Sequence, residues 1–111
     1  MEVTSSLIED KGITVVTVNG RIDSYTYNIF ENEIFTNIDI GQQKLVIDFT
    51  EVNYISSQGL RTLVTALKKA KAQSGFIKLT GLNESVIKIL KVAGLDKVLP
   101  IYPNIEEALQ N

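Results

Sequence analysis

Two residue types that carry much of protein chemistry are missing from this chain of 111 residues, which contains no cysteine and no histidine. Their absence excludes disulfides, a Ser-His-Asp or Cys-His nucleophile pair, and a zinc site built from the usual ligands. Both glycine-rich phosphate loops, Gly-x-Gly-x-x-Gly and Gly-x4-Gly-Lys-Ser/Thr, are also missing. The remaining carboxylates and lysines have no spacing that predicts catalysis. We therefore expect no enzymatic activity, no metal and no cofactor.

The chain also has no apolar run long enough to cross a bilayer. Its N-terminus lacks the basic region followed by an apolar stretch that marks a secretory signal. The net charge is −2, whereas a nucleic-acid-binding surface is usually basic. These features predict a cytoplasmic protein whose partner is another protein rather than a membrane or a nucleic acid.

Hydrophobic residues make up 44% of the sequence, which suits one compact domain with one core. We expect residues 1–111 to form that single domain. Apolar runs predict strands and amphipathic stripes predict helices, in the order β-β-α-β-α-β-α-β-α. The predicted strands are 3–8, 13–18, 44–49, 76–80 and 98–101. The predicted helices begin near Ser24, near Ser56 or Ser57, at Glu84 after the cap Asn83, and near Asn104.

The first two strands flank a turn sequence at 10–12 and predict a hairpin at one side of the sheet. Helices between the later strands require largely parallel pairing, so the expected fold is α/β with a mixed sheet. Ser24 is the expected cap of the first helix. The helix that follows the cap Asn83 is expected to end at residue 93, before Gly94.

The most informative segment is 48–61, where a buried strand gives way to a helix. Downstream apolar residues recur at intervals of three and four, which places the helix start near Ser56 or Ser57. Serine at this position usually caps the helix by accepting a free backbone N–H. On residue type alone, capping is the more frequent role.

Segment 48–60 resembles the signature of STAS domains, specifically the bacterial anti-sigma factor antagonists. Val-Asn-Gly-Arg-Ile-Asp at 18–23 resembles the family's Gly-x-Leu-Asp motif, and Ala-Gly-Leu-Asp-Lys at 93–97 resembles its Gly-Leu segment near the C-terminus. The resemblance extends over almost the whole chain. It implies the same order of strands and helices.

The resemblance also implies a phosphorylated serine two residues before a glycine, which is Ser57 before Gly59. The family often has aspartate at the position before this serine. This chain has Ser56 there, which is a second hydroxyl and therefore the alternative acceptor. The resemblance further implies that the unphosphorylated protein binds an anti-sigma factor, which is often itself a serine kinase. This binding frees a sigma factor. The kinase then phosphorylates the serine and ends the interaction, and a PP2C-type phosphatase restores it.

Several residues around this junction are candidates for partner binding. Asp23 either orients the serine region or polar groups of the incoming kinase, or helps to cap the helix beginning at Ser24. Asp48 is expected to be structural and to accept hydrogen bonds from loop N–H groups. Close approach of backbones, or of a partner, best explains a glycine in the first helical turn. The predicted partner-binding residues are Asp23, Ser56, Ser57, Gln58, Gly59, Arg61, Thr65 and Lys68.

A second function stays open. STAS domains also serve as accessory or scaffold subunits of transporters and signalling complexes, in which the serine is not phosphorylated. The intact serine before Gln58 and Gly59, in a domain with no attached transporter, favours the switch. A weak nucleotide hydrolase is the third possibility, and micromolar nucleotide affinity with turnover would support it.

Overall fold

The computed structural model of the protein describes residues 1–110 and contains a five-stranded sheet in the order β1-β2-β3-β4-β5. Only β1 and β2 pair antiparallel, and the other neighbours pair parallel. The predicted mixed sheet and its edge hairpin are therefore confirmed. The strands are β1 (Glu2–Ile8), β2 (Ile13–Asn19), β3 (Lys44–Glu51), β4 (Phe76–Thr80) and β5 (Ile101–Tyr102).

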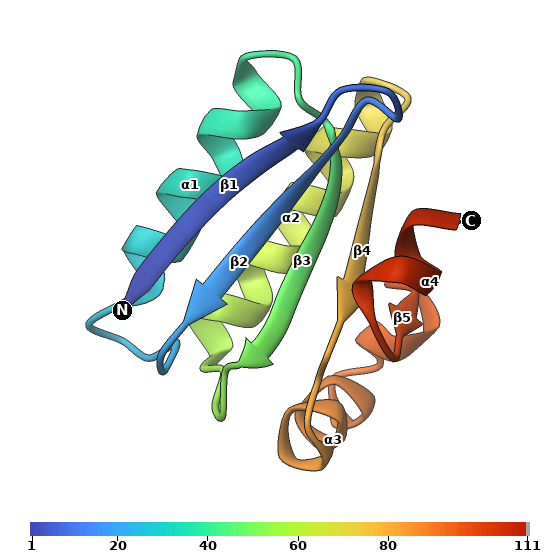
Figure 1. Ribbon diagram of the computed structural model, residues 1–111. Coiled ribbons are helices and arrows are strands. Elements are labelled where there is room, and N and C mark those ends of the chain that lie inside the picture. The colour runs from blue at the N-terminus through green and yellow to red at the C-terminus, as the bar shows by residue number, and fades with distance from the viewer. Residues whose placement is uncertain (111) are drawn as a thin grey trace.

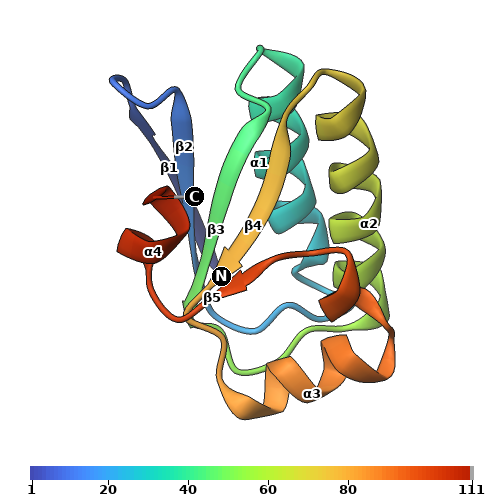
Figure 2. The same ribbon diagram turned by 90° about the vertical axis from the view of Figure 1, so that its right-hand side faces the viewer.

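Helices cover both faces and one end of this sheet. Figures 1 and 2 show α1 and α2 side by side on one face and α4 on the other, with α3 beyond the end at which β3 and β4 finish. The first turn of α2 lies at that same end, so the loop from β3 comes close to α3. The bounds are α1 (Tyr27–Asp39), α2 (Ser57–Ala72), α3 (Glu84–Val92), the 3₁₀ helix η1 (Leu95–Lys97) and α4 (Ile105–Gln110).

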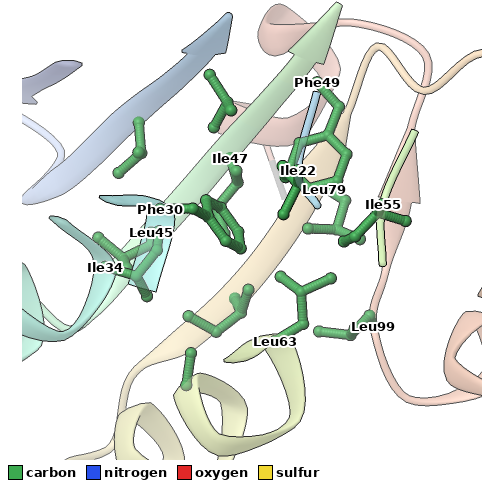
Figure 3. Close-up of a cluster of buried hydrophobic side chains, with 14 of the residues drawn as sticks. Ile22, Phe30, Ile34, Leu45, Ile47, Phe49, Ile55, Leu63, Leu79 and Leu99 are labelled. Carbon is green, nitrogen blue, oxygen red and sulfur yellow. The ribbon is translucent and has the colours of Figure 1, made fainter. Parts of the chain in front are cut away.

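The main core fills the space between the sheet and the helices α1 and α2 (Figure 3). The rings of Phe30 and Phe49 meet edge to face in it, with centroids 6.0 Å apart. A smaller cluster on the opposite face packs around Val46 and Ala108 beneath α4. Because β3 is covered on both faces, its successive residues Leu45, Val46 and Ile47 are all fully buried.

Three local predictions were wrong. Residues 98–100 of the predicted last strand are not in a strand, because the Val98 and Leu99 amides bond back to the Leu95 carbonyl at 3.1 and 2.9 Å. Pro100 then has no N–H to offer a strand ladder, and β5 begins only at Ile101. The first helix begins at Tyr27 rather than near Ser24, and the third ends at Val92 rather than at residue 93.

The start of α2 at Ser57 agrees with the prediction, as does the cap of α3, where the Asn83 side chain accepts from the Val86 amide at 2.9 Å. Among residues 1–110, no helix is long and apolar enough to cross a membrane.

Candidate functional site

Ser56 is the N-cap of α2, and its hydroxyl is committed to that role. Its backbone is extended, with φ −81° and ψ 172°, and its side-chain oxygen accepts from the Gly59 amide at 3.3 Å. The residue is only 7% exposed. This geometry fits an N-cap, in which a side-chain oxygen satisfies one of the free amides of the first turn.

Ser57 is the first residue of α2 and is exposed. The two neighbouring hydroxyls are therefore divided by the helix start, one turned inward as a cap and the other outward. Of the two, the Ser57 hydroxyl is the one that another protein can reach.

A short parallel pairing joins the loop after β2 to the loop after β3. Ile22 and Ile55 form an isolated bridge, in which the Ile22 amide donates to the Tyr54 carbonyl at 3.0 Å and the Ser56 amide donates to the Ile22 carbonyl at 2.8 Å. The bridge lies beyond the regular register of β2 and β3. It fixes the Gly-x-Leu-Asp-like segment against the start of α2, and so brings Asp23 near the serines.

Gly59 is explained by packing inside the protein. A Cβ atom at this position would lie 2.7 Å from a side-chain carbon of Ile22 and 2.7 Å from one of Ile55. The expected close approach of backbones or of a partner is therefore wrong, because the side chains of the bridge itself fill the space. Gly59 is buried and offers no surface to a partner.

The N-cap of α1 is Thr26, without a side-chain cap, and Asp23 rather than Ser24 binds the backbone amides of the turn before the helix. Oδ1 of Asp23 accepts from the Tyr25 amide at 2.9 Å and the Thr26 amide at 3.0 Å, which leaves Ser24 exposed. Its Oδ2 lies 3.4 Å from Nε of Arg21. The bond from the Tyr25 amide lowers the pKa of Asp23 most, partial desolvation opposes that change, and Thr26 and Arg21 lower the pKa further. The carboxylate is therefore charged at neutral pH.

An open depression of about 320 Å³ collects residues from both loops. Its lining contains four of the predicted residues and four that were not predicted as site residues, among them Arg21 and Tyr54. The Arg21 guanidinium lies 4.0 Å from the centre of the Tyr54 ring, in a cation–π contact. The full lining is Arg21, Asp23, Ser24, Tyr25, Tyr54, Ser56, Ser57 and Gln58.

A signal for Arg21 and Tyr54 was present in the sequence. Arg21 is two residues before Asp23, and Tyr54 is two residues before Ser56. In extended segments, alternate residues point to the same side. Once the two motifs are paired through Ile22 and Ile55, these neighbours lie beside the motif residues in the depression.

The remaining candidates lie along α2 outside this depression. Arg61 and Lys68 are exposed and Thr65 is half-buried. Thr62 faces α1 instead, where its hydroxyl lies 3.1 Å from a carboxylate oxygen of Glu31. The structural role expected for Asp48 is confirmed, since its Oδ1 accepts from the Thr50 amide at 3.0 Å.

An apolar depression of about 530 Å³ lies between α2 and α3, next to the Ser57 turn. Leu60 contributes from α2, three residues after Ser57, and Ile89 and Val92 contribute from α3. Val92 is 89% exposed, and it is informative because it lies in an apolar depression together with Leu60 and Ile89 rather than alone on the surface. Lys88 and Ser85 also line this depression. The accessible hydroxyl therefore adjoins an apolar surface.

A family model described as the STAS domain matches residues 5–108. This chain belongs to the STAS domain family. The STAS domain described here is 26% identical over 110 residues to the anti-sigma-B factor antagonist of Bacillus subtilis strain 168, covering 99% of this chain and 100% of that protein.

Solved structures agree with this assignment. A crystal structure of an anti-sigma factor antagonist from Mycobacterium paratuberculosis matches with a TM-score of 0.84 and 28% identity, covering 98% of this chain and 92% of that chain. The Bacillus protein SpoIIAA is 18% identical in its unphosphorylated form, with a TM-score of 0.83 over 98% of this chain and 94% of that chain. Its phosphorylated form matches at a TM-score of 0.75 and 17% identity, over 98% and 97%. At this identity the likeness to SpoIIAA shows the fold alone.

Proposed function

We propose that this STAS domain is an anti-sigma factor antagonist, active in the cytoplasm, that is regulated through Ser57. Unphosphorylated, it binds an anti-sigma factor that is also a serine kinase, and a sigma factor is released. Phosphorylation of Ser57 ends this complex, and a PP2C-type phosphatase restores it. The observation that carries the proposal is the exposed Ser57 hydroxyl beside the buried cap Ser56, within a domain whose relatives are named anti-sigma factor antagonists.

Accessibility favours Ser57 over Ser56 as the acceptor. A kinase must bring the hydroxyl into line with the transferred phosphate, which requires an exposed side chain. The Ser56 oxygen is buried and holds the Gly59 amide. Its modification would remove a cap that typically stabilises a helix by about 1 kcal/mol, and would force a charged group into the interior.

The position of Ser57 explains how a phosphate can control binding without unfolding the domain. A phosphoserine carries about −1.5 to −2 charges at neutral pH. Ser57 is the first residue of α2, where free N–H groups and the positive end of the helix dipole favour an anion. The added charge and bulk therefore act on the surface. SpoIIAA supports this view, because its phosphorylated form has the same fold as this chain.

The surface around Ser57 suits a protein partner. The apolar depression between α2 and α3 offers Leu60, Ile89 and Val92 for burial, and burial of apolar area is the main driving force for most protein association. Gln58, Arg61, Thr65 and Lys68 lie on the same helix as Ser57 and provide polar contacts at its margin. A phosphate on Ser57 would lie within this proposed interface.

A pull-down from lysate of the native host tests the proposal. Wild type, Ser57→Asp and Ser74→Asp are immobilised side by side, and the retained proteins are identified by mass spectrometry. Ser74 is exposed, follows the other end of α2 and tolerates aspartate at its positive φ of 61°, so it controls for added charge alone.

We expect wild type and Ser74→Asp, but not Ser57→Asp, to retain a small ATP-binding serine kinase. Equal retention of a different complex by all three proteins would overturn the switch and favour a phosphorylation-independent scaffold.

A further inference from the structure

We propose that Arg21 is the residue that binds the phosphate once Ser57 is phosphorylated. Its guanidinium then turns from Asp23 to the phosphoserine, while Asp23 stays in place. This inference rests on the proposed phosphorylation of Ser57 and assigns the group that recognises the modified side chain. Phosphorylation would then add charge at Ser57 and also change the ion-pair partner of Arg21.

The backbone holds Arg21 and Ser57 at the same depression. Both residues line it. The Ser56 amide donates to the Ile22 carbonyl at 2.8 Å, and Arg21 directly precedes Ile22 while Ser57 directly follows Ser56. The Arg21 side chain is 58% exposed, so it is free to reorient above this fixed backbone. Binding a phosphate on Ser57 therefore requires a rotamer change of one side chain and no movement of the fold.

The present contacts of Arg21 leave most of its donors available. The Tyr54 ring contacts the face of the guanidinium, 4.0 Å from ring centre to carbon, and does not use its N–H groups. The ion pair to Asp23 is 3.4 Å long and largely exposed on the Arg21 side, and such pairs are weak. A guanidinium has five N–H donors in a planar fork that matches a phosphate with two parallel bonds.

Asp23 does not need Arg21 in order to keep its position. Its Oδ1 accepts from two backbone amides, at 2.9 and 3.0 Å, and lies 3.1 Å from the Thr26 hydroxyl. When Arg21 turns away, the carboxylate therefore remains hydrogen-bonded and charged. The exchange replaces a singly charged partner of Arg21 by one that carries nearly two charges.

The ionisation of the phosphate reports this contact. Asp23 lines the same depression as Ser57, and Glu51 lines a neighbouring depression that Arg21 also borders. The negative charge of each carboxylate raises the second pKa of a phosphate on Ser57. Arg21, and Arg61 one helical turn after Ser57, lower it. Replacing Arg21 therefore raises the pKa only if its guanidinium lies close to the phosphate.

The test uses the full chain with phosphoserine introduced at position 57 during translation, so that no kinase is needed. The second pKa of the phosphate is measured by ³¹P NMR in the wild-type, Arg21→Gln, Arg21→Lys and Lys71→Gln backgrounds. Lys71 is an exposed residue of α2, 14 positions from Ser57 and so about 21 Å along the helix. It controls for the loss of one positive charge.

We expect Arg21→Gln to raise the phosphate pKa by about 1 unit, the lower end of the shift caused by an opposite charge within 4–6 Å. Arg21→Lys should lie between wild type and Arg21→Gln, and Lys71→Gln should match wild type. Equal values for wild type and Arg21→Gln, with unchanged circular dichroism, would overturn the inference. Because no partner is present, that result would leave the pull-down free to support or refute the proposed function separately.

Discussion

The hydroxyls of Ser56 and Ser57 are neighbours in the chain but have opposite environments. The Ser56 oxygen accepts from the Gly59 amide inside the first turn of α2, and the Ser57 side chain is exposed above it. The helix start separates a structural serine from one that is open to modification. Each serine therefore has its own test.

Replacing Ser56 by alanine should lower stability, and replacing Ser57 should not. Ser56→Ala removes the cap of α2, which should cost about 1 kcal/mol in the free energy of unfolding. Ser57→Ala changes an exposed side chain, and its effect should stay within about 0.5 kcal/mol. Urea denaturation measures both. Equal losses for the two variants would contradict the division of roles.

The same pair should separate in a phosphorylation assay with the captured kinase and ATP. Ser56→Ala should still accept phosphate, because its Ser57 hydroxyl is intact. Ser57→Ala should remain unphosphorylated and still bind the kinase. Phosphopeptide mapping identifies the acceptor, and phosphate found on Ser56 in the Ser57→Ala protein would make Ser56 the true site.

Gly59→Ala should destabilise the domain because the new Cβ lies 2.7 Å from side-chain carbons of Ile22 and Ile55. Overpacking of this kind costs about 1–3 kcal/mol. Gln58→Ala, one residue earlier in the same turn, is the control for an alanine substitution at this end of α2 and should change stability by less than about 0.5 kcal/mol. A Gly59→Ala protein as stable as wild type would show that the bridge can move aside.

The pH dependence of stability should carry a contribution from Asp23. Its hydrogen bonds lower its pKa below the ordinary value of 3.8 in the folded protein. The stabilisation is therefore fully present above that value and is lost as the pH falls through the lower, folded pKa. Asp23→Asn keeps an oxygen that can accept from the amides but removes the charge.

Urea unfolding of wild type and Asp23→Asn should therefore show a wild-type advantage near neutral pH that shrinks below about pH 4. An advantage that stays constant from neutral pH to about pH 3 would show that the charge of Asp23 contributes nothing.

The apolar depression between α2 and α3 should contribute to partner binding. Val92 is 89% exposed there, so Val92→Gln should change stability by less than about 0.5 kcal/mol. It should nevertheless weaken binding of the captured kinase about tenfold, corresponding to about 1.4 kcal/mol. Val98→Gln is the matched control, because Val98 is 50% exposed and lies outside the lining of this depression. Titration calorimetry compares them, and equal affinities for both variants would place the interface elsewhere.

Periodicity and caps predicted most of this fold. The apolar run at 45–47 in β3 reflects burial on both faces of the sheet, and the apolar stripe of α2 reflects burial on one face of the helix. The errors arose where short-range hydrogen bonds decided the outcome. Asp23 rather than Ser24 holds the amides before α1, and the turn at Leu95 removes Val98 and Leu99 from the sheet.

The candidate site was only partly accessible to the same reasoning. Motif resemblance located Ser57 and Asp23, but the contact between their loops depends on the Ile22 and Ile55 bridge, which joins residues 33 positions apart. Arg21 and Tyr54 enter the site only through that tertiary pairing. Gly59 was predicted to allow close approach of backbones or of a partner, whereas one of the two side chains that fill its space, Ile22, is 37 positions earlier and is brought there only by the bridge.

The most direct test of the switch is the affinity of the captured kinase for the unmodified protein and for the protein carrying phosphoserine at position 57. Titration calorimetry with ADP in place of ATP prevents phosphorylation during the measurement. We expect the phosphate to weaken binding at least tenfold, while circular dichroism shows the same fold in both forms. Equal affinities for the two forms would contradict it.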